Sequence, residues 1–174
     1  YVSGTLVLKD GVALWLDRGA TLLASTEAAD FPPHWPAFKS YTDTYVCQSL
    51  LYAENAHDIA VLGPGTIDGR GGDPAWKTTK DRNRYRERPY LIRFVTCRNV
   101  RVQGVTLLDS PMWTQHYLAC DDVVLDDHPG ARLDLGLQAS RARLPVLDGL
   151  PDHAADSLIV QRMLRRDGLR QALM

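Results

Sequence analysis

Short runs of alternating apolar and polar residues recur along the first two thirds of the chain. The segments 57–63, 98–104 and 121–125 share one pattern, a turn-forming Asp or Asn followed by apolar residues at every second position. Alternation with a period of two is typical of a half-buried β-strand. Each segment therefore predicts a short strand that begins at an Asp or Asn corner.

The spacing of these strands indicates a repeat. Asn99 and Asp122 are 23 residues apart, whereas Asp58 and Asn99 are 41 residues apart with a polar stretch between them. A looser copy of the pattern, 11–16 followed by 19–23, comes earlier in the chain. Short strands that recur at intervals of roughly 20–50 residues predict a solenoid of parallel strands.

Two other architectures fit this order less well. A β-sandwich needs hairpin signals between consecutive strands. A fold that alternates strands with helices needs helices of about ten or more residues between the strands. Neither pattern occurs before Leu125.

Two polar stretches interrupt the repeat. Residues 26–44 contain a proline-rich run at 31–36, and residues 76–88 are dense in Lys, Arg, Asp and Asn. We predict that both stretches are long loops inserted into the coils. Long loops on one face of a solenoid often build its binding groove.

Cys97 and Cys120 are also 23 residues apart. The repeat therefore predicts that they stack at the same corner of successive coils, about 4.8 Å apart. That separation is within disulfide range, but we favour the plainer interpretation, a ladder of buried free thiols. With Cys47 the chain has three cysteines, too few and too odd in number for a disulfide scaffold.

The composition changes near Leu125. No Phe, Trp or Tyr follows Tyr117, and Leu, Arg, Ala and Asp dominate the last part of the chain. We assign residues 1–125 to the coils and residues 126–174 to a disordered, irregular or helical tail, in which 154–172 has a partly helical period. A shifted reading frame after about residue 125 and a divergent natural end would both explain this change.

The overall charge and hydropathy exclude some partners. A net charge of −1 gives no reason to expect nucleic acid or an anionic membrane. The longest apolar runs are too short to cross a bilayer, and no signal peptide opens the chain. The opening residues read instead like the middle of a strand and turn, which indicates that the true amino terminus lies upstream. Since no His has metal-ligand spacing with a Cys, Asp or Glu, we predict no metal and no cofactor.

Four stretches match motifs that occur together, in this order, in one enzyme family. They are Leu14–Ser25, which matches an opening coil, Gly63–Gly71 with Trp76 (G-x-G-T-I-D-G-x-G…W), Arg88–Val100 (R-P-x-x-I-x-F…C-x-N-V) and Ser110–His116 (S-P-x-W-x-x-H). Each motif alone is weak, but the ordered set covers roughly residues 3–125. The chain thus resembles the polygalacturonase (pectinase) family, glycoside hydrolase family 28.

The resemblance implies a fold and a reaction. The fold is all-β, a right-handed single-stranded parallel β-helix of the pectin-lyase-like type, of which this chain would be an amino-terminal part. The reaction is inverting hydrolysis of galacturonate-containing, pectic polysaccharides. Inversion needs an acid and a base carboxylate roughly 6.5–9.5 Å apart. The family supplies these from an N-T-D-type segment and an Asp-Asp pair, followed by G-H-G and R-I-K segments.

This sequence departs from the family pattern after Leu125, where none of those segments occurs. The pair Asp121-Asp122 occupies the corner position of the repeat, where a turn residue that bonds its own backbone explains it best. The pair Asp126-Asp127 begins the non-matching tail. We therefore assign no catalytic residue to this chain.

Trp113 and His116 are the candidate substrate-binding residues, because the resemblance places their segment near the cleft. An aromatic face can stack on a sugar ring, and an imidazole can bond hydroxyls or a carboxylate. The alternative, with Trp113 inside the coil and His116 bonded to a loop backbone, stays equally open. We interpret Asp68 as a turn residue, and the basic run 82–88 as a solvated loop.

Together these observations favour a polygalacturonase-type O-glycosyl hydrolase that is inactive as this chain. The alternative function is a non-catalytic carbohydrate-binding β-helix. A pectate-lyase-like β-helix would need a carboxylate cluster for Ca²⁺, which the sequence does not offer. The resemblance implies a pectin-like polysaccharide as partner and a secreted or periplasmic location. An uncapped β-helix end would also favour self-association, since its strand edges are unpaired.

Overall fold

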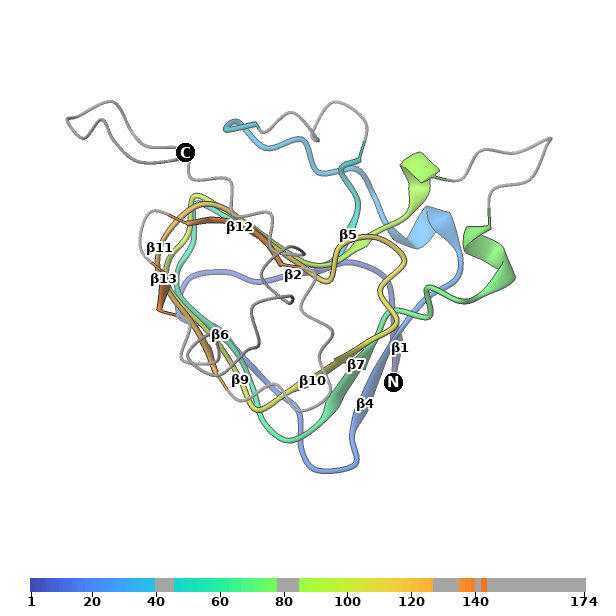
Figure 1. The fold of residues 1–174 in the computed structure, drawn as a ribbon, viewed down its shortest axis with the longest axis horizontal. Helices are drawn as coiled ribbons and strands as arrows, with labels where there is room; N and C mark the ends of the chain where they lie inside the picture. The colour runs from blue at the N-terminus through green and yellow to red at the C-terminus, as the bar shows by residue number, and fades with distance from the viewer. Residues whose placement is uncertain (40–45, 78–84, 127–134, 140–141, 144–174) are drawn as a thin grey trace, which may run out of the picture.

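In the computed structural model the chain winds into successive coils that stack on one another (Figure 1). The structure describes residues 1–39, 46–77, 85–126, 135–139 and 142–143. Each pairing between its strands is parallel. Viewed down the stack, the coils outline a three-sided tube whose faces we call A, B and C. The predicted right-handed parallel β-helix is therefore confirmed.

Each face collects equivalent strands from successive coils. Face A is a four-stranded sheet of β1 (Val2–Ser3), β4 (Thr21–Ala24), β7 (Thr66–Asp68) and β10 (Thr106–Leu108). Face B holds β2 (Leu6–Val7), β5 (Ser49–Glu54), β8 (Tyr90–Val95), the first part of β11 (Gln115–Asp126) and β12 (Leu135–Ala139). Face C holds β3 (Ala13–Trp15), β6 (His57–Leu62), β9 (Arg98–Gln103), the rest of β11 and β13 (Ala142–Arg143).

The corners between faces B and C show why Asp and Asn recur there. Asp58, Asn99 and Asp122 have φ angles of 55°, 50° and 52°, in the left-handed region. Asp and Asn tolerate this region better than other residues with a Cβ. The Asn99 side-chain amide also donates a hydrogen bond to the Asp58 carboxylate in the neighbouring coil. The predicted Asp or Asn corner is confirmed in all three coils.

A second left-handed corner lies three residues earlier in each coil. It is formed by Asn55, Thr96 and Ala119, with φ angles of 54°, 51° and 52°. The Thr96 hydroxyl donates to the Asn55 side-chain carbonyl at 2.5 Å. Two sharp corners so close together turn the chain from face B to face C without a separate loop.

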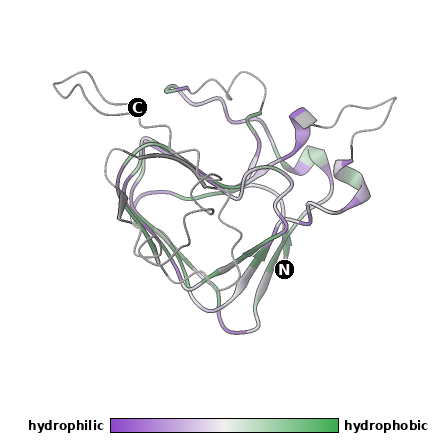
Figure 2. Cartoon of the chain, in the orientation of Figure 1, coloured by the Kyte–Doolittle hydropathy of each residue, from purple (hydrophilic) through white to green (hydrophobic). Residues whose placement is uncertain are grey.

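The core lies inside the tube and is built from apolar rows. Ile59, Val100 and Val123 stand in register on face C, and each is at most 1% exposed. Phe94 and Tyr117 form a similar row on face B and are fully buried. In Figure 2 apolar residues recur along the strands of successive coils. Stacking between coils thus removes from water the surface that a single short strand cannot bury.

Cys97 and Cys120 stack between neighbouring coils, as the repeat predicts. Cys97 precedes Arg98 and Cys120 precedes Asp121, and Arg98 and Asp121 are paired between neighbouring strands. Both thiols are fully buried and free. A hydrogen bond between the thiols lowers the pKa of Cys97 and raises that of Cys120. The free-thiol ladder is therefore confirmed.

The long connections gather at one corner, between faces A and B (Figure 1). They contain the short 3-10 helices η1 (Ala28–Asp30), η3 (Pro74–Trp76) and η4 (Tyr85–Glu87). Trp76 is 1% exposed and meets Phe31 edge to face at 5.9 Å, so two connections are anchored to each other. The second connection is thus not wholly solvated: its described start packs into the core.

The described part of the tail continues the stack, since β12 and β13 pair in parallel with β11. The helical period at 154–172 lies outside the described residues, and the boundary near residue 125 stays a prediction. Among the described residues, no helix has the length and hydropathy that a membrane crossing would need.

Candidate functional site

The outer surface of face B carries one row of side chains from four successive coils. Val7, Tyr52, Arg93 and His116 are paired in register across β2, β5, β8 and β11. Their neighbours along the strands, such as Phe94, belong to the interior cluster. Since side chains alternate across a strand, the row faces away from that interior.

At one end of this row lies an aromatic cluster. Tyr90 and His116 are stacked, with ring centroids 5.2 Å apart and an interplanar angle of 13°. Trp113 meets both rings edge to face, at 5.8 Å from Tyr90 and 5.7 Å from His116. Trp113 is partly exposed, whereas Tyr90 and His116 are buried. The structure therefore brings the two predicted site residues together, with Trp113 at the surface and His116 beneath it.

His116 is held as a neutral imidazole. Its side chain is 1% exposed, and neither ring nitrogen has a hydrogen-bond partner within the described part of the chain. Burial, and secondly the positive charge of Arg93, lower its pKa from 6.5 to about 3. A neutral imidazole has one donor and one acceptor nitrogen, so His116 keeps both capacities at neutral pH.

Arg93 is the site residue that the sequence did not single out. Its guanidinium lies 5.2 Å from the centroid of the Tyr90 ring, and Nη1 approaches the backbone oxygen of His34 at 3.5 Å. Burial lowers its pKa to about 10, so it remains charged at neutral pH. Two features of the sequence could have identified Arg93. It is an arginine inside an otherwise apolar strand, and it precedes His116 by 23 residues, which places both in the same row.

The first long connection, which contains His34 and Ala37, packs against face B near the other end of the row, at Tyr52 and Glu54. The His34 ring stacks on Tyr52, with centroids 4.4 Å apart. Tyr52 donates its hydroxyl proton to Glu54 Oε2 at 2.9 Å, and the Ala37 amide donates to Glu54 Oε1 at 2.8 Å. Burial, aided by Glu54, raises the pKa of Tyr52. These contacts leave an open recess of about 500 Å³ lined by Val7, Leu8, Lys9, His34, Tyr52, Glu54 and Asn55.

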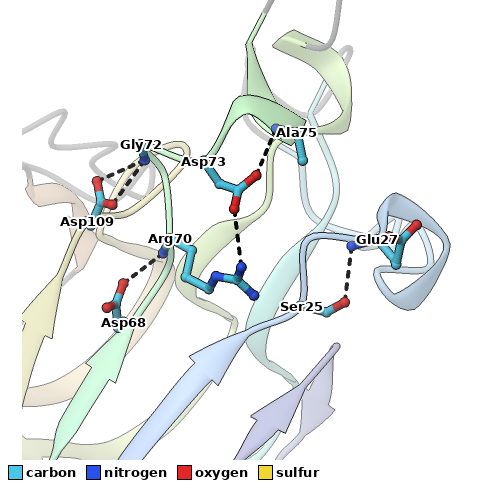
Figure 3. A network of polar contacts seen from close by, with 8 residues as sticks. All are labelled: Ser25, Glu27, Asp68, Arg70, Gly72, Asp73, Ala75 and Asp109. Carbon is cyan, nitrogen blue, oxygen red and sulfur yellow. Dashed lines mark hydrogen bonds and ion pairs between the residues drawn. The ribbon is translucent and has the colours of Figure 1, made fainter.

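The G-T-I-D-G segment serves a structural purpose (Figure 3). The Asp68 carboxylate accepts from the Arg70 amide at 2.8 Å, which confirms its interpretation as a turn residue. The Asp109 carboxylate accepts from the Gly72 amide at 3.1 and 3.0 Å, and Arg70 pairs with Asp73 at 3.1 Å. These bonds hold the start of the second connection against the neighbouring coil.

Other sequence candidates occupy structural positions. Asp122 is a corner residue, as described above. In the basic run, Arg82 and Arg84 lie outside the described residues, and Arg88 Nε donates to the Trp76 backbone oxygen at 2.9 Å. Within the described ranges, no three His, Cys, Asp or Glu side chains gather closely enough to hold a metal ion. The described groups on the outer side of face B that can meet a ligand are therefore partly exposed Trp113 and the lining of the recess, whereas Tyr52, Arg93 and His116 are at most 4% exposed.

Comparison with known proteins gives consistent results. Residues 15–129 match the family model described as glycosyl hydrolases family 28. A polygalacturonase of Ralstonia nicotianae is 42% identical over 74 residues, which is 41% of this chain and 14% of the relative. An endo-polygalacturonase of Pectobacterium carotovorum subsp. carotovorum is 31% identical over 123 residues, 64% of this chain and 30% of the relative.

Solved structures show the same fold. An exopolygalacturonase from Thermotoga maritima superposes with a TM-score of 0.56 at 20% identity, covering 75% of this chain and 38% of the other.

The matched part of the chain spans less than a third of the length of the two sequence relatives named above.

Proposed function

The chain belongs to glycosyl hydrolase family 28, and from this premise we propose that it is part of a polygalacturonase-type hydrolase of pectic polysaccharides. The observation that carries the proposal is the aromatic cluster on face B, at the corner where the long connections gather. Partly exposed Trp113 would stack on a sugar ring, as aromatic side chains do with flat apolar surfaces. His116 and charged Arg93 behind it would favour an anionic sugar such as galacturonate.

The reaction proposed for the family needs two carboxylates placed across the scissile bond, one as acid and one as base. The sequence contains no N-T-D-type segment and no G-D-D segment after Leu125. On face B, the Glu54 carboxylate is engaged in structure, because it accepts hydrogen bonds from the Tyr52 hydroxyl and the Ala37 amide. We therefore propose that this chain binds the polysaccharide but does not cleave it.

A binding and hydrolysis assay on the same sample tests this proposal. We expect the chain to bind polygalacturonate without releasing reducing ends. Trp113→Ala should weaken binding up to about tenfold because it removes the stacking face. Trp15→Ala, on face C and 61% exposed, is the matched control and should leave binding unchanged. Reducing-end release by the unmodified chain would contradict the proposed inactivity, and equal binding by both variants would contradict the site.

The second candidate is a carbohydrate-binding β-helix that never had catalytic residues. The recess and aromatic cluster on face B favour this function as much as the first. The two candidates differ in one requirement: the first needs an acid and a base carboxylate, whereas the second needs neither. Two finer proposals go with either candidate. A pectic substrate would place the protein outside the cytoplasm, secreted or periplasmic, and the exposed apolar residues Tyr1, Val2, Val12 and Trp15 near strand edges support self-association.

A further inference from the structure

The outer surface of face C lies on the side of the tube away from the long connections, where Figure 1 labels β6 and β9. Two rows of side chains in register cross its strands: Ala60, Arg101 and Val124, and Trp15, Leu62 and Gln103. Their neighbours along the strands, such as Val61 and Val102, are fully buried in the core. Because side chains alternate across a strand, both rows face away from the core and form a mostly apolar surface.

Trp15 is the largest apolar group on this surface. It is 61% exposed, and its indole N–H donates a hydrogen bond to Asp17 Oδ1 at 2.8 Å. This bond satisfies the polar atom of the ring and fixes the ring's orientation. A partner that covers Trp15 would therefore gain its apolar surface and lose little side-chain freedom. Trp and Arg are also the side chains that most often dominate the energy of protein interfaces.

Face C carries two opposite charges that are not neutralised within the described part of the chain. Arg101 is exposed, and its side chain makes no hydrogen bond or ion pair with a described residue. The Asp17 carboxylate accepts from Trp15 but has no described cation within ion-pair distance. Asp17 follows β3 and Arg101 lies on β9, so β6 separates the two charges.

A surface with opposite charges on the two sides of a central strand is complementary to itself. A half turn about an axis along β6 lays the β3 side of each copy over β9 of the other copy. Arg101 of one copy then meets Trp15 and Asp17 of the other, and the same contact forms twice. A guanidinium both stacks on an indole ring and pairs with a carboxylate.

We propose that face C is an interface between two copies of this chain, closed by Arg101 against Trp15 and Asp17. The inference assigns the proposed self-association to one surface. A polyanionic polysaccharide fits this surface less well, because Asp17 would repel it beside Trp15. Face B takes no part in the contact, so Trp113 stays accessible in both copies. The strands of face C are short, and interfaces that bury less than about 1,200 Å² are typically weak, so we expect dissociation at roughly micromolar concentrations.

The test is sedimentation of the full chain over a range of concentrations, with two charge-reversal variants. Arg101→Glu and Asp17→Arg should each weaken dimerisation at least tenfold, because like charges then face each other twice in the dimer. An equimolar mixture of the two variants should dimerise again, since both contacts of the mixed dimer pair opposite charges. Arg98→Glu is the matched control: it reverses the same charge on the same strand, at the exposed corner with face B, and should dimerise like the unmodified chain.

Each outcome supports the interface or overturns it. Dimerisation by Arg101→Glu and Asp17→Arg as strong as that of the unmodified chain would overturn the face C interface and leave association through strand edges. A mixture that stays monomeric would overturn the two-fold pairing of Arg101 with Asp17. An unmodified chain that stays monomeric would overturn self-association altogether. Polygalacturonate binding is tested separately through Trp113→Ala, which should dimerise normally, so the proposed function and this inference fail independently. Circular dichroism checks that the variants, which change only exposed side chains, keep their coils.

Discussion

Replacing Gly63 with alanine should destabilise the chain by about 3 kcal/mol or more, because two penalties act together. Gly63 has a φ angle of 108°, which residues with a side chain rarely adopt. An added Cβ would also lie 2.2 Å from the backbone oxygen of Leu16 in the preceding coil. That oxygen cannot move away independently, since it accepts a hydrogen bond from Gly65. Equilibrium unfolding in urea measures the loss.

Gly11→Ala is the matched control for this substitution. Gly11 also has a positive φ angle, 70°, but a Cβ added there would meet no atom within 4 Å. Only the backbone penalty of about 1–2 kcal/mol applies there. A loss at Gly63 no greater than that at Gly11 would show that the coils are not stacked as closely as the structure has them.

Lowering the pH from 7 to 4 should remove about 3 kcal/mol of stability through His116. The folded-state pKa of His116 is about 3, below the unfolded value of 6.5. The unfolded chain therefore binds a proton at pH 4 that the folded chain excludes, and stability falls as the pH drops through this window. His116→Phe preserves a ring against Tyr90 but cannot ionise, so it should lose much less stability over the same range.

Unfolding curves of both proteins at pH 7 and pH 4 measure the difference. His57→Phe is the control, because the His57 side chain is half exposed and beside Asp10 and Asp58. His57→Phe should lose as much stability between pH 7 and pH 4 as the unmodified chain, because it keeps His116. If His116→Phe and the unmodified chain lose the same stability on acidification, the imidazole is not buried as described.

The parallel coil could be predicted because its physical requirements recur in the sequence. Apolar alternation marks the strands, and the left-handed corners select Asp or Asn at positions such as Asp58 and Asn99. The second corner was missed, because Thr96 and Ala119 carry no signal for a left-handed backbone. Stacking on neighbouring coils overrides the local preference of these residues.

The candidate site could be predicted only in part. Trp113 and His116 were singled out because they share one short motif that resembles a segment of the family, and their role in binding stays a prediction. Arg93 was missed, since strand residues of unlike type become neighbours only through the register of the sheet. The recess was also missed, because Lys9, His34 and Glu54 come from separate segments and meet only when a long connection folds over face B.

The central claim, that the outer surface of face B binds a galacturonate chain, is tested most directly by nuclear magnetic resonance. Oligogalacturonate is titrated into the labelled chain while the indole N–H signals of Trp113 and Trp15 are followed, each assigned by a Trp→Phe variant. We predict a saturable shift of the Trp113 signal, on face B, and no shift of the Trp15 signal, on face C. A shift of Trp15 with Trp113 unmoved would contradict the claim.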